Sequence, residues 1–162
     1  MHVDKIILHK IIEEELTTLL QNTTEAAQQA HETATHEGNK AENKYDTLGL
    51  EAAYLAAGQS KRVAELEHKL QAFKKLKVRD FTEDMPIGIG ALVSLNTMEN
   101  DKKYVFLSPV SGGLEIEFNK IKLMLISESS PLGKALKNSF IGDDILIRQA
   151  HHELNYEISG LW

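Results

Sequence analysis

Three carboxylates fall within ten consecutive residues, between two long stretches of helical pattern. The ten residues read EGNKAENKYD (37–46) and include Glu37, Glu42 and Asp46 with almost nothing apolar. Carboxylates so close together can bind a metal ion, but turns between helices are polar as well. Asp46, followed by Thr47, could equally cap the second helix, and that role competes with metal binding. The residues alone leave these interpretations open.

The other residues that could do chemistry form no recognisable site. The 162 residues contain no cysteine, which excludes a disulfide scaffold, a Cys-ligated zinc site and a thiol nucleophile. The seven histidines show no metal-binding spacing, and the pair at 151–152 is expected in a loop between strands. Ser130 directly precedes Pro131 and is explained as a helix N-cap rather than as a nucleophile.

Composition indicates a globular chain with an acidic balance. Hydrophobic residues make up 42% and the net charge is −6, which argues against stand-alone binding of duplex DNA. No run of 18 apolar residues and no charged-then-apolar leader is present, so we expect neither a membrane span nor a signal peptide. A basic cluster, KKLKVR (74–79), could meet an acidic surface or be solvated. The absence of cysteine fits a cytoplasmic location.

Apolar spacing predicts two long helices that position the acidic stretch at their junction. From residue 3 to about 36, a 4-3-4-3 spacing places one seam on a helix, and residues 52–73 repeat it. A short polar turn between two such helices predicts an antiparallel coiled-coil hairpin. The seam side chains are large near Leu16 and Leu70 and become alanine toward the turn. Packing therefore stabilises the half of the hairpin near the turn less than the other half. A helix of about 30 residues is roughly 45 Å long, which predicts a projecting arm.

From about Arg79 the pattern changes to short β-prone segments. Six are predicted, at 91–97, 103–109, 114–118, 122–127, 145–149 and 156–162, with one helix in SSPLGKALKNS (129–139). We therefore predict an α+β protein with two domains: a helical arm over 1–78, with its acidic tip at 37–46, and a small antiparallel β domain with one helix over 79–162.

Several short motifs in order resemble the Gre-type transcript cleavage and elongation factors of bacteria. They are SPLGKAL (130–136), Gly142-Asp143-Asp144 and Tyr156-Glu157-Ile158, with YLAAGQSKRVAELEHKL (54–70) similar to the returning helix of the Gre arm. The resemblance covers nearly the whole chain. It implies an FKBP-like C-terminal domain that docks on RNA polymerase and an arm that enters the secondary channel. It also implies that Ser130, Pro131 and Leu132 contribute to docking, although Leu132 could simply pack onto the sheet.

In the Gre family the tip bears a Gly-Asp-x-Ser-Glu-Asn pattern, whose two acids help position a second Mg²⁺ and a water for cleavage of backtracked RNA. This chain has GNKAEN (38–43), so Gly38, Glu42 and Asn43 match. Asn39 replaces the first acid and Ala41 the serine. Asn39 offers a neutral carbonyl oxygen, a weaker ligand for a hard cation than a carboxylate. Asp46 or Glu37 could take over the missing role.

The resemblance thus predicts a transcription elongation factor that is not itself an enzyme. Glu42 and Asp46 are the expected catalytic and metal-binding residues, and Mg²⁺ would be shared with the polymerase active site. RNA polymerase is the expected partner, with indirect contact to the nascent RNA 3′ end, no membrane and a monomeric chain. Whether the tip stimulates cleavage or only modulates the channel stays open. The alternative is a peptidyl-prolyl isomerase or chaperone-like binding module, although the sequence shows no aromatic-lined pocket for it.

Overall fold

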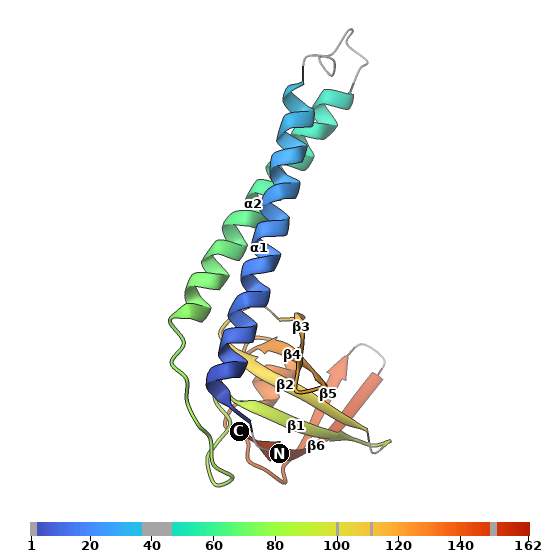
Figure 1. The fold of residues 1–162 in the computed structure, drawn as a ribbon. Helices are drawn as coiled ribbons and strands as arrows, with labels where there is room; N and C mark the ends of the chain where they lie inside the picture. The colour runs from blue at the N-terminus through green and yellow to red at the C-terminus, as the bar shows by residue number, and fades with distance from the viewer. Residues whose placement is uncertain (1–2, 37–46, 100, 111, 150–151) are drawn as a thin grey trace. The chain divides into compact units, whose positions relative to one another are not determined.

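The computed structural model describes residues 3–36, 47–99, 101–110, 112–149 and 152–162. Its elements follow the order α1(Lys5–Thr35), α2(Leu48–Lys74), β1(Leu92–Thr97), β2(Lys102–Ser108), β3(Glu115–Phe118), β4(Ile121–Ser127), α3(Pro131–Leu136), β5(Asp144–Gln149) and β6(His152–Leu161) (Figure 1). The α+β prediction is confirmed, with two long helices ahead of a sheet. The predicted loop at 151–152 is wrong for His152, which begins β6 and pairs with Gln149.

The chain divides into two compact units. One consists of Glu14–Gln71, and the other combines Met1–Glu13 with Ala72–Trp162. The first turns of α1 and the end of α2 therefore belong with the sheet. The boundary that the sequence places between residues 78 and 79 stays a prediction about domains.

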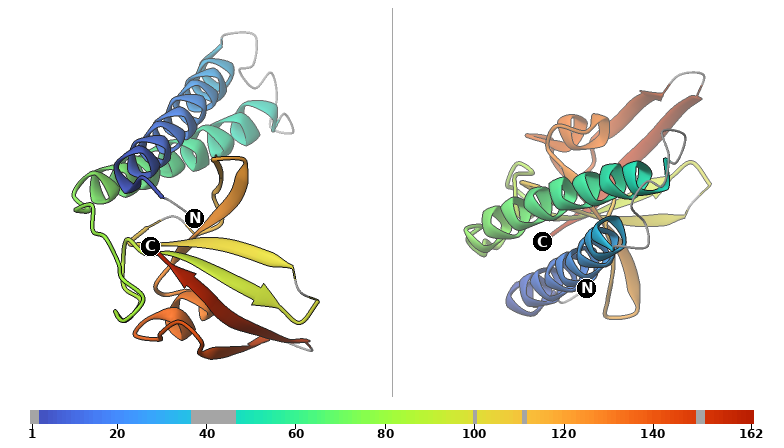
Figure 2. Two further views of the ribbon diagram at one scale, coloured as in Figure 1. Left: turned by 60° about the horizontal axis from the view of Figure 1, so that its bottom comes forward. Right: turned by 90° about the horizontal axis from the view of Figure 1, so that it is seen from above.

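In the helical unit, α1 and α2 lie side by side (Figures 1 and 2). The buried residues of this unit are Leu16, Thr23, Ala30, Ala56, Leu66 and Leu70. Beyond Thr23 the seam of α1 keeps Ala30, but Ala27 and Ala34 are half-buried in place of Ala26 and Thr33, which are exposed. A straight helix has 3.6 residues per turn, so a 3.5-residue pattern drifts around it. Alanine buries little area, and this part of the unit is held mainly by helix propensity.

The sheet has six strands in the order β3-β4-β2-β1-β6-β5. All neighbouring strands are antiparallel except β2 and β4, which pair in parallel from Tyr104↔Leu123 to Ser108↔Ser127. The prediction of a purely antiparallel sheet is therefore wrong, and the sheet is mixed. The reason is a tight β3–β4 hairpin: Asn119 and Lys120 both have positive φ, as a two-residue hairpin turn of type I′ requires. This hairpin places β4, not β3, beside β2.

Strand alternation gives the sheet two apolar faces. One face carries the core cluster, in which β1, β2, β5 and β6 contribute Val93, Leu95, Val105, Leu107, Ile145, Ile147 and Ile158, and α3 contributes Leu136. The other face carries Phe106, whose ring lies 5.5 Å from His9 of α1 and 6.2 Å from Phe73 of α2. Figure 2 (left) shows α3 and the first turns of α1 on opposite sides of the sheet. Both faces are thus covered by helix, but unequally.

Candidate functional site

The acidic stretch EGNKAENKYD (37–46) lies outside the described residues, so the roles of Glu42 and Asp46 stay predictions. The described chain leaves α1 after Thr35 and enters α2 at Leu48. Thr47, immediately before α2, has its hydroxyl 3.3 Å from Glu51 Oε1, and Glu51 N donates to Thr47 O. Within the part of the chain that the structure describes, no group of three or more His, Asp or Glu side chains could hold a metal ion.

The SPLG segment (130–133) forms the N-terminal end of α3. Ser130 Oγ accepts a hydrogen bond from Gly133 N at 3.0 Å and donates to Ser127 O at 2.7 Å. Pro131 occupies the first helical position, where its missing N–H costs nothing. A side chain on Gly133 would place Cβ 2.0 Å from Ser127 O, so only glycine permits this approach of α3 to the end of β4. The predicted N-cap is confirmed, and the Ser130 hydroxyl serves the fold.

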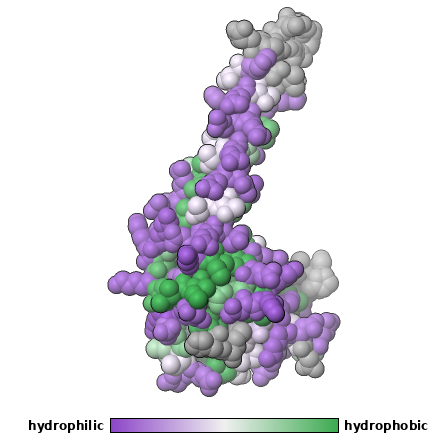
Figure 3. Space-filling view, viewed as in Figure 1, coloured by the Kyte–Doolittle hydropathy of each residue, from purple (hydrophilic) through white to green (hydrophobic). Residues whose placement is uncertain are grey.

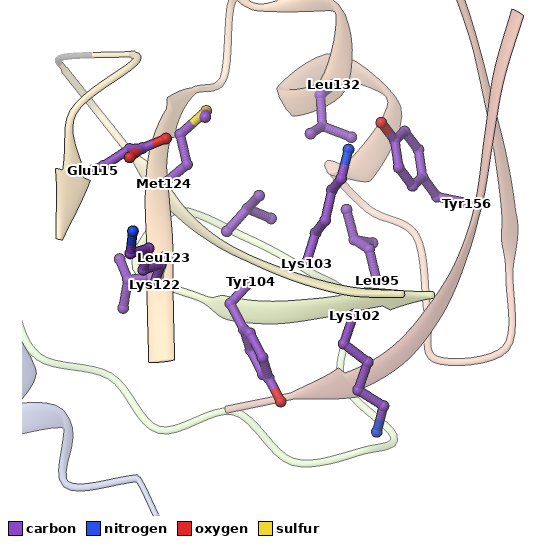
Figure 4. Close-up of a pocket in the computed structure, with 11 residues that line it drawn as sticks. Leu95, Lys102, Lys103, Tyr104, Glu115, Lys122, Leu123, Met124, Leu132 and Tyr156 are labelled. Atoms are coloured by element: carbon purple, nitrogen blue, oxygen red, sulfur yellow. The ribbon is translucent and has the colours of Figure 1, made fainter. Parts of the chain in front are cut away.

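Leu132 borders a hollow on the α3 face of the sheet. The hollow has a volume of about 530 Å³, within the usual range for ligand pockets. Its lining residues are Leu95, Lys102, Lys103, Tyr104, Val105, Glu115, Lys122, Leu123, Met124, Leu132 and Tyr156. Figure 4 shows Leu95, Lys103, Leu132 and Tyr156 on one side of β2, whereas Tyr104 and Lys102 point to the other side. The hollow therefore lies between α3 and the outer half of the sheet.

The register explains why these side chains meet. Leu95 pairs with Lys103, and Val105 pairs with Met124, which in turn pairs with Glu115 on β3. Cross-strand partners project to the same face, so the two rows form a continuous floor. Leu95 and Val105 are buried, while Met124 is 40% exposed at the open end.

Charge around the hollow has the opposite sign to that of the whole protein. Three lysines and one glutamate line it, a balance of 3 − 1 = +2, whereas the full chain carries −6. The Lys103 ammonium lies 5.4 Å from the centre of the Tyr156 ring, a cation–π geometry. Tyr156 is itself buried. The lining thus offers an apolar surface with cations at its rim.

The sequence does not reveal this hollow, because its lining comes from six separate segments of the chain. Tyr156 reaches it only through the pairing of β6 with β1, and Leu132 only through the packing of α3. In the sequence, Tyr156 stands out only as part of the Tyr156-Glu157-Ile158 motif. The sequence shows no aromatic-lined pocket, and in the structure two tyrosines, Tyr104 and Tyr156, are among the residues that line this hollow.

The opposite face of the sheet holds buried polar groups from α1. The Lys5 ammonium donates to Gly90 O and, at 2.9 Å, to Trp162 O. Burial lowers the pKa of Lys5 to about 8, against an opposing effect of Asp80. Burial also lowers the pKa of His9, as does the nearby Lys5 charge. His9 Nε2 has no hydrogen-bond partner among the described residues. Nothing here opens to solvent as a site would.

A third surface is apolar without being hollow. In Figure 3 green side chains gather near the lower end of α1 as Figure 1 draws it. Ile6 and Ile7, in the first turns of α1, are 71% and 51% exposed. These two positions point away from the buried Leu8 and Ile12.

The chain is an α+β protein with two long helices in one unit and a mixed sheet with a short SPLG helix in the other. Its described residues contain no preformed metal centre. Its sequence is 30% identical to transcription elongation factor GreA of Acholeplasma laidlawii over 93% of this chain and 89% of that protein. It is 28% identical to GreA of Neorickettsia sennetsu, again over 93% and 89%. No protein-family model matches the chain.

Solved structures give the same family names at lower identity. The GreA factor homolog Gfh1 of Thermus thermophilus is 20% identical, with 93% of this chain and 94% of that chain covered and a TM-score of 0.39. GreA/GreB from Nitrosomonas europaea is 18% identical, with 64% and 78% covered and a TM-score of 0.36.

The chain belongs to the GreA family of transcription elongation factors. The curated relatives carry the name of transcription factors and not of enzymes. None of the helices described is long and apolar enough to cross a membrane.

Proposed function

We propose that the chain is a cytoplasmic, monomeric elongation factor that binds RNA polymerase through its sheet unit. The helical hairpin enters the secondary channel and brings residues 37–46 to the nascent RNA 3′ end. There the chain stimulates or modulates transcript cleavage in backtracked complexes. The observation that carries this proposal is the 30% identity to a GreA elongation factor over 93% of the chain, which spans both units.

The donor set of residues 37–46 fits a shared Mg²⁺. Glu42 and Asp46 supply anionic oxygens, the ligands that Mg²⁺ prefers, and Mg²⁺ usually keeps most of its ligands from water and substrate. When bound, the ion would stabilise developing negative charge during cleavage. Asn39 supplies a neutral oxygen where the family pattern has an acid, so the chain's own contribution to holding the ion is weaker. We therefore expect slow cleavage rather than none.

The test is RNA shortening in a stalled, backtracked complex of the cognate polymerase with Mg²⁺. The wild-type chain should shorten the labelled RNA, and Glu42→Ala and Asp46→Ala should each abolish the effect. Glu25→Ala is the matched control, since it removes an exposed carboxylate of α1 that lies outside residues 37–46 and has no assigned role.

Asn39→Asp sharpens the test. Because it restores the anionic oxygen of the family pattern, it should raise the cleavage rate above that of the wild type, by roughly tenfold for one added metal ligand. If no variant shortens the RNA but the chain competes with a GreA protein for polymerase, the chain is a modulator that occupies the channel without promoting cleavage. Neither shortening nor competition would overturn the proposal.

The alternative of a prolyl isomerase or chaperone-like module has one observation in its favour. The hollow between α3 and the sheet places the buried Tyr156 beside apolar side chains, as a site for an apolar peptide would. It gives no role to the two long helices, however, and the relatives are named for elongation.

A further inference from the structure

We propose that the free edge of β5 is a self-association surface, and that its partner is β5 of a second copy of this chain. The two strands lie antiparallel about a two-fold axis at Leu146, so that the two six-stranded sheets become continuous. This inference goes beyond the proposed function, which does not require it. The monomer is the form of the chain at low concentration, and the dimer forms as the concentration of free chain rises.

The strand β5 lies at one end of the sheet. It pairs with β6 on one side, and no described strand lies on its other side (Figure 1). An edge strand presents N–H and C=O groups that can hydrogen-bond to another chain, and proteins often protect such edges with lysine or proline. The sequence of β5, DILIRQ, contains neither, and Leu146 at its centre is 49% exposed. The edge is therefore open to the addition of a strand.

The hydrogen bonds at the start of β5 indicate which of its backbone groups face outward. Ile158 N of β6 donates to Asp143 O, immediately before β5, at 3.0 Å. Hydrogen-bonded pairs recur at every second residue of an antiparallel ladder, so β5 bonds to β6 through Ile145 and Ile147. The N–H and C=O groups of the even-numbered residues, with Leu146 at their centre, face the free edge. Pairing of Leu146 with its copy then forms two hydrogen bonds at the axis.

Charge makes this strand complementary to itself. In a two-fold pairing centred on Leu146, Asp144 of one copy lies opposite Arg148 of the other, and the pair occurs twice. Opposite charges directly across a ladder stabilise the pairing of strands, whereas like charges destabilise it. Asp144 forms no ion pair with any cation in the part of the chain that the structure describes. Arg148 bonds to Glu153 through Nε, its side chain is 78% exposed, and its guanidinium has further N–H donors for a second carboxylate.

The opposite edge of the sheet lacks this complementarity. There the end strand is β3, which has four residues, and its two exposed side chains are both glutamates, Glu115 and Glu117. Two copies of β3 would bring like charges together. A two-fold contact uses each β5 edge once, so association stops at the dimer. One strand pair buries less than the roughly 1,600 Å² of a standard interface, and we therefore expect a weak dimer.

The experiment measures the mass of the full chain by sedimentation velocity, from micromolar to millimolar concentration. The mass should approach that of two chains at the upper end. Asp144→Arg and Arg148→Asp should each raise the dimer dissociation constant by roughly tenfold, because each places like charges at both copies of the pair. An equimolar mixture of these two variants should recover the association, since every arginine then lies opposite an aspartate. Glu117→Arg is the matched control: it makes the same charge change as Asp144→Arg on β3 and should dimerise as the wild type does.

Three results would overturn the inference. The first is the mass of one chain at every concentration. The second is a dimer that Asp144→Arg and Arg148→Asp leave intact, or a mixture of the two that stays monomeric although circular dichroism melting shows both variants folded. The third is an equal loss of association in Glu117→Arg, because net charge would then explain it. Leu146→Glu, at an exposed position, is a further variant that should weaken the dimer by placing two carboxylates at the axis.

The inference and the proposed function can fail separately. Polymerase binding and RNA shortening are measured with the chain dilute, where the dimer is not populated. Absence of the dimer therefore leaves the proposed function as it stands, and absence of polymerase binding leaves the dimer as it stands.

Discussion

The two faces of the six-stranded sheet are closed to different extents. On the α1 face, Leu8, Ile12, Phe73 and Phe106 are at most 2% exposed. On the α3 face Leu95, Leu107 and Leu136 are also fully buried, but Met124 at the edge is 40% exposed and a hollow lies beside Leu132. Both faces have the same strands and the same alternation of side chains. The difference therefore comes from what the helices cover.

This contrast separates stability from binding. Burial of large apolar side chains stabilises the fold, and the α1 face buries them fully. An apolar surface that is left uncovered contributes less to folding and stays available to a partner. The two faces therefore differ at the edge near Met124, which is 40% exposed, and not in the burial of their central side chains.

The largest effect we expect comes from the closed face. Phe106→Ala should lower the free energy of unfolding by about 3 to 5 kcal/mol, because it removes a fully buried ring that contacts His9 and Phe73. Met124→Ala, on the open face, should lower it by less than about 1 kcal/mol. Urea unfolding followed by circular dichroism measures both. Equal losses would mean that the two faces are not different in kind.

A smaller effect is expected at the start of α3. Ser130→Ala removes the N-cap acceptor of Gly133 N and should cost about 1 kcal/mol of stability. Ser130→Thr retains a hydroxyl and should cost less. Polymerase binding should fall with Ser130→Ala only as far as α3 is displaced. A large loss of binding in Ser130→Thr, with the melting temperature unchanged, would instead make Ser130 a direct contact.

The smallest effect should appear with pH, through a single group on the closed face. Burial, and then the charge of Lys5, lower the pKa of His9 below 6.5. As pH falls through 6.5 the unfolded chain takes up a proton that the folded chain does not, so the free energy of unfolding falls. The melting temperature should drop between pH 7.5 and 5.5. His9→Leu should drop less over the same interval, and an equal slope would show that other groups cause it.

Much of the fold could be predicted because its signals are local. Short β-prone segments predicted all six strands near their observed positions, and Ser130-Pro131 predicted the start of α3. The parallel pairing of β2 with β4 could not be predicted, because it depends on which strand a tight hairpin places beside β2. The burial of Lys5 also has no local signal, since its partners, Gly90 and Trp162, are far along the chain.

The two candidate sites also differ in whether local sequence signals reveal them. Glu42 is identified by a family motif and Asp46 by its position a few residues away, and the role of both stays a prediction. The hollow was missed because Lys103, Leu132 and Tyr156 come together only through tertiary structure. Sequence motifs indicated the helix start next to the hollow, but not the surface itself.

The most direct test of the central claim is a titration of labelled wild-type chain with cognate RNA polymerase, followed by displacement with an unlabelled GreA protein. We expect saturable binding that GreA displaces completely, because both proteins would occupy the same channel. The absence of binding, or binding that a saturating amount of GreA leaves unchanged, would contradict the account.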